Sequence, residues 1–373
     1  MYYKRFWTYI NLFRNKSRTL MYAKQYLFCL ILFLISTGCT RQKQIQQLPE
    51  IVKTYELGNL DIKSGSCHPI EETRTFIHAA DMFVYHDSIL IVLNKPTASH
   101  VLELYNLKSK EIISKHILFG NGPKEMLNCK ADLYNNILLV RDFVRMNYIT
   151  INLNDLLINP EYDIVLKSYK SKLPIYNLYP INDDILFLNP YCYEDSEVPI
   201  SNTEPRFFYN QRKFNLKDLY NSCNVAQGMM ACNFTDSLIV FASYYYPELE
   251  IYNFELSPKA FVYGPKRMDI NVVIREREII FKGYIPLSYR GMTCDDTCIY
   301  TMFQGSDNSI DNFCYLIKYN WDGTMLEIYQ IENNSLSTLS KSMFPDKFYC
   351  VGNDEFGKVL YEINLNNSYE ESN

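Results

Sequence analysis

The sequence predicts an all-β fold, a six-bladed β-propeller closed by an N-terminal strand. A polar turn that leads into an apolar, β-forming stretch, as in residues 182–188, recurs along the chain at intervals of 48 to 60 residues. The six copies are anchored at Asp87, Asn135, Asp183, Asp236, Asp296 and Asp354. This period is typical of propeller blades. Composition agrees, since 32 Tyr, 22 Phe and only 13 Gly among 373 residues favour strands over a large core. We expect a single folded domain over residues 51–366.

The first repeat shows the expected order of four strands, at residues 76–85, 88–93, 101–107 and 111–119, with a turn at His86 and Asp87. A second motif, an Asn between two apolar residues, marks the end of the third strand. Its copies are at Asn106, Asn152, Asn215, Asn253, Asn320 and Asn364. Asn suits this place because its side chain can bond to the backbone of a tight turn.

Residues 51–57 alternate as a strand should, yet they precede the first anchor by thirty residues. The last repeat is short, with 19 residues after Asp354. We therefore expect residues 51–57 to complete the last blade, which would cover two exposed sheet edges.

Residues 1–38 are predicted to be a signal peptide. A basic stretch precedes the ten apolar residues 26–35, which are too few to span a bilayer. The run ends in Ser36-Thr37-Gly38-Cys39, which resembles a bacterial lipobox, although Ser36 replaces the usual Leu. We expect a lipid on Cys39, a flexible tether over residues 39–50 and a polar tail over residues 367–373. A plain secretion signal is the alternative, and Met21 is a second candidate start.

The chain that remains after residues 1–38 has 31 basic and 42 acidic residues, a net charge of 31 − 42 = −11. An acidic body argues against nucleic acid as a partner. The cysteines show no spacing typical of a disulfide framework, so most are interpreted as buried apolar residues.

Residues 119–126 contain Gly120, Gly122, Pro123 and Glu125, but neither the third Gly nor the helix of a dinucleotide-binding loop follows them. A shorter copy begins at Gly264. Recurrence at equivalent places favours a structural loop over a ligand site.

Together with Tyr289-Arg290-Gly291-Met292, this loop resembles the TolB-like six-bladed β-propeller lipoproteins of Bacteroides-type bacteria. The resemblance implies a lipid-anchored propeller of unassigned function and supplies no catalytic residue. In that group, acidic residues just after the lipidated Cys accompany surface export, and none occurs here before Glu50. We therefore expect a periplasm-facing protein in the envelope of a Gram-negative bacterium.

No metal or cofactor is predicted. The five His fall on different strands and turns of one repeat, and Cys294 and Cys298 have no second cysteine pair. The acid pairs Asp183-Asp184 and Asp295-Asp296 are interpreted as solvated turn residues rather than as a general acid and base.

The sequence favours a non-enzymatic binding or scaffolding module, a monomer with the membrane as partner through Cys39 and a protein or saccharide as ligand. The alternative is a hydrolase or lyase acting on a sugar or a lactone, which would need acids from different blades at one end of the channel. Candidate ligand-binding residues in the channel and its rim are Asp81, Tyr176, Tyr179, Gln227, Arg290 and Tyr349.

Overall fold

A computed structural model describes residues 50–365, and all of these belong to one compact unit, Leu48–Asn373. The description omits residues 135, 143, 160–163, 169–174, 181–185, 191–205, 208–227, 245–246, 256, 266–271, 276–277, 282–286, 305–311 and 356. For residues 175–180, 186–190, 206–207, 272–275 and 278–281 it covers the backbone only. Within these limits the chain is all-β, with one α-helix, α2 (Leu153–Ile158), and two 3-10 turns, η1 (Leu57–Asn59) and η2 (Glu71–Thr75).

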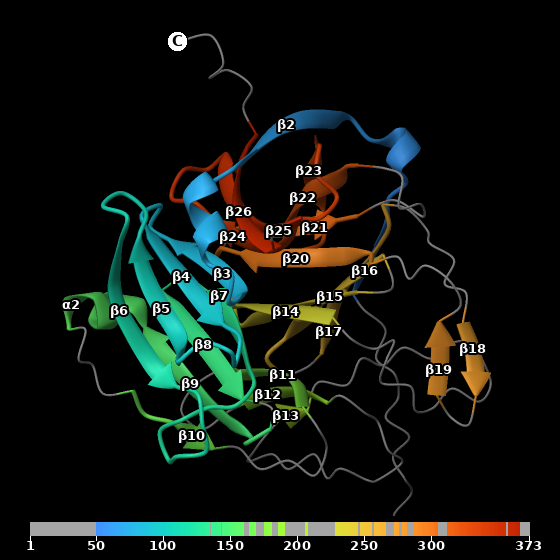
Figure 1. Cartoon of the computed structure of the whole chain (residues 1–373). Coiled ribbons are helices and arrows are strands. Elements are labelled where there is room, and N and C mark those ends of the chain that lie inside the picture. Colours follow the sequence, from blue (N-terminus) through green and yellow to red (C-terminus); the bar gives the residue numbers. More distant parts are fainter. Residues whose placement is uncertain are drawn as a thin grey trace, which may run out of the picture. The chain divides into compact units, whose positions relative to one another are not determined.

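The strands form sheets that follow one another along the chain (Figure 1). The first sheet contains β3 (Ala79–Tyr85), β4 (Ile89–Asn94), β5 (His100–Asn106) and β6 (Glu111–Leu118). The second contains β7 (Cys129–Tyr134), β8 (Ile137–Asp142), β9 (Asn147–Asn152) and β10 (Lys167–Ser168). In both, consecutive strands pair antiparallel, which confirms the predicted four-strand order.

The third sheet contains β11 (Ile175–Pro180), β12 (Leu186–Pro190) and β13 (Arg206–Phe207). The fourth contains β14 (Gly228–Asn233), β15 (Leu238–Ser243), β16 (Glu248–Asn253) and β17 (Pro258–Tyr263). A separate hairpin, β18 (Val272–Arg275) and β19 (Glu278–Phe281), follows it.

The fifth sheet contains β20 (Tyr289–Cys294), β21 (Cys298–Phe303), β22 (Cys314–Asn320) and β23 (Met325–Ile331). The sixth contains β24 (Ser337–Lys341), β25 (Lys347–Asp354) and β26 (Gly357–Asn364). Two strands from the start of the described chain, β1 (Ile51–Thr54) and β2 (Ile62–Pro69), add to the later sheets.

The hydrophobic core lies between the faces of neighbouring sheets. Separate clusters of buried side chains join the first sheet to the second, the fourth to the fifth and the fifth to the sixth. A further cluster joins the sixth sheet to the first, with Val351 and Leu360 packed among Met82, Val84 and Val92. The end of the described chain therefore packs against its beginning.

In the described sheets the Asn motif ends the third strand, as predicted, whereas the copy at Asn215 lies outside the described residues. Asn106 accepts hydrogen bonds from the backbone N–H groups of Lys108 and Ser109, at 2.9 and 3.0 Å. Asn253 and Asn320 each accept one from a residue four positions on, at 2.8 Å. The side chain thus stabilises the turn that leads to the fourth strand.

The N-terminal strand that closes the last sheet is not the predicted one. Residues 51–54 form β1, which pairs in parallel with β17 of the fourth sheet. The sixth sheet is completed by β2, whose residues Ser66 to Pro69 pair antiparallel with β26. The first half of β2, from Ile62 to Gly65, pairs in parallel with β23 of the fifth sheet. One strand therefore covers the outer edges of the fifth and sixth sheets and joins them into one eight-stranded hydrogen-bonded sheet.

The last predicted anchor was also wrong. Asp354 is the last residue of β25, the second strand of the sixth sheet, whereas Asp87, Asp236 and Asp296 lie between the first and second strands of their sheets. Asn135 and Asp183 lie outside the described residues. The equivalent turn is Ser342 to Asp346, between β24 and β25. The error arose because Asn353 and Asp354 also precede an apolar stretch, so the local pattern occurs twice in this repeat.

These edge contacts predict unequal effects of two truncations. A chain that begins at Tyr55 loses only β1, a short strand with mostly exposed side chains, and its melting temperature should fall by only about 2 °C. A chain that begins at Ile70 also loses β2, which leaves two sheets without their outer strand, and it should show no cooperative melting transition. Circular dichroism melts of both truncations and of a chain that begins at Leu48 measure this. Equal melting temperatures for the two truncations would contradict the role assigned to β2.

Candidate functional site

A cavity of about 390 Å³ lies where the first strands of five sheets come together. Its walls include residues of β3, β7, β14, β20 and β24. These strands are neighbours in space, with β20 beside both β14 and β24, and with β3 beside both β24 and β7. The side chains of the third sheet lie outside the described residues. The charged residues of the described lining are Asp81, Lys130, Asp132, Arg141, Arg290 and Lys358.

Three of these first strands carry a β-bulge at the cavity. The register shifts between Ala79 and Asp81 in β3, between Tyr289 and Gly291 in β20, and between Ser337 and Leu339 in β24. The additional residues in the three bulges are Ala80, Arg290 and Thr338, and each of them lines the cavity. A bulge reorients a side chain relative to the regular alternation of a strand. Local irregularities therefore determine which side chains face this space.

Gly291 allows two of the bulged strands to approach each other closely. A Cβ atom on Gly291 would lie 3.2 Å from the backbone nitrogens of Thr338 and Leu339. That distance is tighter than an ordinary contact, so a side chain here would push β24 away from β20. The absence of a side chain at Gly291 thus brings Arg290 and Thr338 onto the same part of the wall.

Asp81 links the first sheet to the sixth. Its carboxylate accepts a hydrogen bond from the Thr338 hydroxyl at 3.0 Å and one from the Met82 backbone N–H at 3.0 Å. Burial raises the pKa of Asp81, and the Lys358 ammonium and these hydrogen bonds offset part of that rise. The carboxylate of Asp132 raises the pKa of Asp81 further, so the two acids lie within electrostatic reach of each other.

Asp132 is paired with a buried arginine. The guanidinium of Arg141 on β8, which is 3% exposed, donates to the Asp132 carboxylate. Burial raises the pKa of Asp132, whereas Arg141 and Lys130 act to lower it. Lys130 and Arg141 are direct partners in the antiparallel pairing of β7 with β8. Both basic side chains therefore reach the cavity from adjacent strands.

Two more cations come from the other side of the cavity. Arg290 donates from Nη1 to the backbone carbonyl of Asn334 at 2.6 Å, which holds its guanidinium near β24. Lys358 is on β26 and acts on Asp81 through its charge. Four basic and two acidic side chains thus form the charged part of the described cavity lining.

The structure brings some of the predicted channel residues together. Asp81 and Arg290 line the cavity. The backbone of β11 has a register shift between Ile175 and Asn177, so Tyr176 is the additional residue of a fourth bulged first strand. The side chains of Tyr176 and Tyr179, and all of Gln227, lie outside the described residues.

Tyr349 does not line the cavity. It is 3% exposed and belongs to the core cluster between the sixth and first sheets. The wrong position of the last anchor explains this, because it identified β25 as a first strand, whereas the first strand is β24. Thr338 occupies the place that Tyr349 was expected to fill. The sequence analysis also missed Lys130, Asp132, Arg141 and Lys358. Alternation of polar and apolar residues along β7 was the signal that could have found two of them.

The loop at residues 119–126 is held together by its own contacts. The carboxylate of Glu125 accepts a hydrogen bond from the Gly122 backbone N–H at 2.6 Å. A Cβ atom on Gly120 would lie 2.1 Å from that same carboxylate. Arg145 donates to the backbone carbonyls of Gly122 and Glu125, each at 2.6 Å. Pro123 lies inside this turn, and none of these residues lines the cavity.

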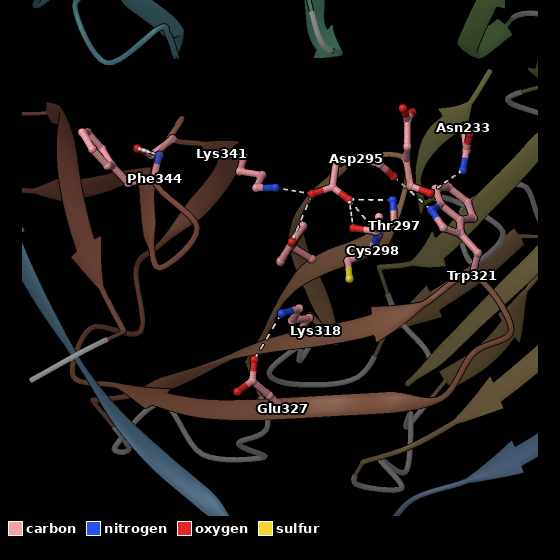
Figure 2. A network of polar contacts seen from close by, with 12 residues as sticks. Asn233, Asp295, Thr297, Cys298, Lys318, Trp321, Glu327, Lys341 and Phe344 are labelled. Atoms are coloured by element: carbon pink, nitrogen blue, oxygen red, sulfur yellow. Dashed lines mark hydrogen bonds and ion pairs between the residues drawn. The ribbon is translucent and has the colours of Figure 1, made fainter. Parts of the chain in front are cut away.

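Asp295 is a second polar centre, in the turn between β20 and β21 (Figure 2). One carboxylate oxygen accepts from the backbone N–H groups of Thr297 and Cys298, at 2.8 and 2.7 Å. The other pairs with the ammonium of Lys341 at the end of β24. The Asp295 backbone carbonyl accepts from the Trp321 ring nitrogen at 3.0 Å. Asp295 lies in the predicted turn, but its side chain is only 23% exposed, and its carboxylate is also a structural link between two sheets.

The pKa values agree with that role. Burial alone would raise the pKa of Asp295, but the Lys341 ion pair and the hydrogen bonds from Thr297 and Cys298 outweigh it and lower the pKa to about 2.

Among the described residues, no group of three or more His, Cys, Asp or Glu side chains is arranged to hold a metal ion. The part of the chain that the structure covers also contains no helix of the length and hydropathy that a membrane span requires.

Comparison with known proteins finds no matching family model and no matching curated protein. Among solved structures, a member of the DUF4221 family from Bacteroides vulgatus has a TM-score of 0.48 at 12% identity and covers 82% of this chain and 98% of its own. A proposed exported protein of Bacteroides fragilis has a TM-score of 0.48 at 10% identity, over 85% and 99% of the two chains. The calcium-binding protein regucalcin from Agrobacterium tumefaciens has a TM-score of 0.37 at 11% identity, over 84% and 94%. These values assign the chain to no family.

The Asp295 network predicts a stability difference that depends on pH. Replacing Lys341 with Met should lower the free energy of unfolding at pH 7 by about 1 kcal/mol, because the Lys341 ion pair supplies one part of the Asp295 pKa depression and the hydrogen bonds from Thr297 and Cys298 supply the rest. A depressed pKa stabilises the fold above the ordinary carboxyl pKa and loses that effect as the pH falls. The difference between wild type and variant should therefore narrow from pH 4 to pH 2 in denaturant melts.

Lys110→Met is the matched control, since it breaks an ion pair with Glu72 in which both side chains are exposed. It should change stability little at any pH. An effect of Lys341→Met that stays constant from pH 7 to pH 2 would show that Lys341 acts through packing rather than through Asp295.

Proposed function

We propose that this chain is a lipid-anchored β-propeller of six blades that binds a small polar ligand in the cavity between its first strands. The blade interpretation is supported by the order of the sheets along the chain and by the packing of the sixth sheet on the first. The neighbour relations of β14, β20, β24, β3 and β7 are those of strands around an axis. Ligand pockets are usually found at such a convergence of several elements.

One observation carries the binding function. In the described lining, six charged side chains from five strands face a single cavity, and both carboxyl groups of this lining have pKa values raised by burial. Bringing charges together away from water costs free energy, and a purely structural cavity is more stable with apolar walls. Perturbed carboxyl groups in a cavity are therefore candidates for a functional site.

The cavity size fits a small ligand. A volume of about 390 Å³ is within the range that holds small molecules, which is roughly 300 to 1,000 Å³. The walls are formed by strands, which hold side chains more rigidly than loops do. We therefore favour a soluble ligand over a protein partner for this site.

Enzymatic activity is the alternative, and one observation favours it. Asp81 and Asp132 come from different sheets and lie within electrostatic reach of each other on one cavity, as a hydrolase acting on a sugar or a lactone would require. Both carboxyl groups are already engaged, Asp81 with Thr338 and Asp132 with Arg141. An acid held in an ion pair is a poor proton donor, so binding is the first proposal.

Attachment to a membrane through a lipid is also part of the proposal. The apolar run that ends at Cys39 and the tether after it would place the domain beside a membrane, facing the periplasm. The net charge of −11 after residues 1–38 favours a domain that stays off an anionic bilayer surface. A lipid on Cys39 would then supply the membrane attachment.

Ligand binding is testable by thermal shift with a panel of small probes, namely monosaccharides, sugar acids, hydroxy acids and lactones. At least one probe should raise the melting temperature saturably, since a ligand at 100 times its Kd stabilises by about 2.7 kcal/mol. Ala131→Phe, which places a ring in the cavity from β7, should abolish the shift.

Ala98→Phe is the control, because this residue lies in the turn between β4 and β5 and not in the cavity wall. A probe-induced rise in melting temperature that persists in the Ala131→Phe variant would show that the probe binds outside this cavity. Turnover of a probe that is lost in both Asp81→Asn and Asp132→Asn would favour the enzyme instead.

Lipidation of Cys39 can be tested by fatty-acid labelling and membrane sedimentation. The full chain, expressed in a Gram-negative host that is fed an alkyne-tagged fatty acid, should carry the label and sediment with membranes. Cys39→Ala should lose both properties, whereas Cys29→Ala, within the apolar run, should keep them. Label retained in Cys39→Ala would contradict the lipobox interpretation.

A further inference from the structure

The turns between the first and second strands of four sheets lie together at one end of the domain, which we call the turn end. Asn233, at the end of β14, donates a hydrogen bond to the backbone carbonyl of Asp296 at 3.0 Å. The Asp295 ion pair joins the same turn to the end of β24 (Figure 2). The Met343 backbone N–H donates to the Asp87 carboxylate at 3.1 Å. The turns of the fourth, fifth, sixth and first sheets are thus linked in succession.

The described chain enters the domain at the turn end. Because consecutive strands of the fourth sheet pair antiparallel, β17, its fourth strand, runs away from this end. β1 pairs in parallel with β17, with Ile51 opposite Ala260, so β1 begins at the turn end. Glu50 forms an ion pair with Lys259 there, at 2.6 Å.

The predicted lipid is close to this entry point along the chain. Cys39 precedes Glu50 by 50 − 39 = 11 residues. An extended chain spans at most about 3.6 Å per residue, so eleven residues reach at most about 40 Å. An anchor of this length keeps the end at which it attaches nearer to the membrane than the opposite end. A lipid on Cys39 would therefore orient the turn end toward the bilayer.

The turn of the sixth sheet differs from its neighbours at this end. It contains five residues, Ser342 to Asp346, whereas the turns of the first, fourth and fifth sheets contain three, four and three. Its Met343 and Phe344 are 69% and 63% exposed. The first and fifth turns contain only polar residues, and the fourth has a single large apolar residue, Phe234. The sixth turn therefore presents two adjacent apolar side chains to solvent.

The backbone of this turn is held in place. The Ser342 N–H donates to the Lys347 carbonyl at 3.1 Å, and the Ser342 hydroxyl accepts from the Phe344 N–H at 3.0 Å. The bond from Met343 to Asp87 fixes the same turn to the first sheet. Groups that are already ordered lose less entropy when they bind. The apolar pair is thus pre-organised for an apolar partner.

The identity of that partner follows from position and charge. Exposure alone does not decide it, because Val144 is 62% exposed at the opposite end, in the turn between β8 and β9. Only the turn end has both an exposed apolar pair and the entry of a chain that carries the predicted lipid. The net charge of −11 after residues 1–38 argues against an anionic lipid surface. A bilayer of zwitterionic lipid fits both conditions.

We propose that Met343 and Phe344 insert into the surface of a zwitterionic bilayer, so that the domain stands on the membrane with its turn end. Moving these side chains from water into the acyl region is favourable, and it adds a second contact to the lipid on Cys39. This inference rests on the lipid that is part of the proposed function, and it names the face that meets the membrane.

Tryptophan fluorescence of the full chain, purified with its lipid and reconstituted in phosphatidylcholine vesicles, tests the insertion. Phe344→Trp should lose about half of its added fluorescence when the acyl chains carry bromine, a short-range quencher, because the side chain lies at their boundary. Replacing phosphatidylcholine with phosphatidylglycerol should reduce this quenching, since the acidic domain is repelled. The wild type, which retains Trp321, supplies the background.

Val144→Trp is the matched control. It replaces an equally exposed apolar side chain at the opposite end, so bromine should leave its fluorescence unchanged. Melting temperatures of both variants show that each remains folded. Sedimentation with the vesicles measures attachment through the lipid independently of the quenching.

The outcomes distinguish this inference from the lipid anchor. A chain that sediments with vesicles but shows no quenching in Phe344→Trp, or equal quenching in Val144→Trp, would overturn the orientation and leave the anchor. A chain that does not sediment would overturn both. A dimer in detergent that Phe344→Ser dissociates, together with unquenched Phe344→Trp, would assign the apolar pair to a second copy of the chain instead of the membrane.

Discussion

The arrangement of the sheets depends on the hydrogen bonds that β2 makes along both of its halves. A sheet with an open outer edge exposes unpaired N–H and C=O groups, and β2 satisfies those of β23 and of β26 in succession. The change of partner occurs after Gly65, where a Cβ atom would lie 2.5 Å from a methyl group of Ile331. A residue without a side chain lets the strand pass from one sheet to the next at close range.

This closure has consequences for the cavity. The sixth sheet packs its Val351 and Leu360 against the first, and this contact holds β24 beside β3. Only then can the Thr338 hydroxyl reach the Asp81 carboxylate. The site is therefore assembled from opposite ends of the described chain, and its geometry depends on an edge contact on the outside of the molecule.

Much of the architecture could be predicted from sequence because it is locally encoded. The strand order, the Asn106-type turns and the need for an N-terminal closing strand all follow from short patterns of polar and apolar residues. The closing strand itself could not be identified, since residues 62–69 contain Gly65 and Pro69 and have a weaker strand propensity than residues 51–57, so only long-range pairing reveals their place. The residues of the candidate site were harder to predict than the closing strand. Asp81 and Arg290 were among the candidates chosen from expected first strands, whereas Thr338 was missed because the last anchor was placed one strand too late.

The bulges suggest why a repeated fold can carry one specific site. In a regular strand the side chains alternate, so equivalent positions in successive sheets would present a ring of similar groups to the cavity. The bulges at Ala80, Arg290 and Thr338 recur at the second residue of their strands, so the repeat places an inserted residue at the same point of each wall. The three inserted side chains are a methyl group, a guanidinium and a chain with a hydroxyl, and they differ in size, charge and hydrogen bonding. The repeat thus determines where these side chains lie, and the residue types at those positions determine the chemistry of the site.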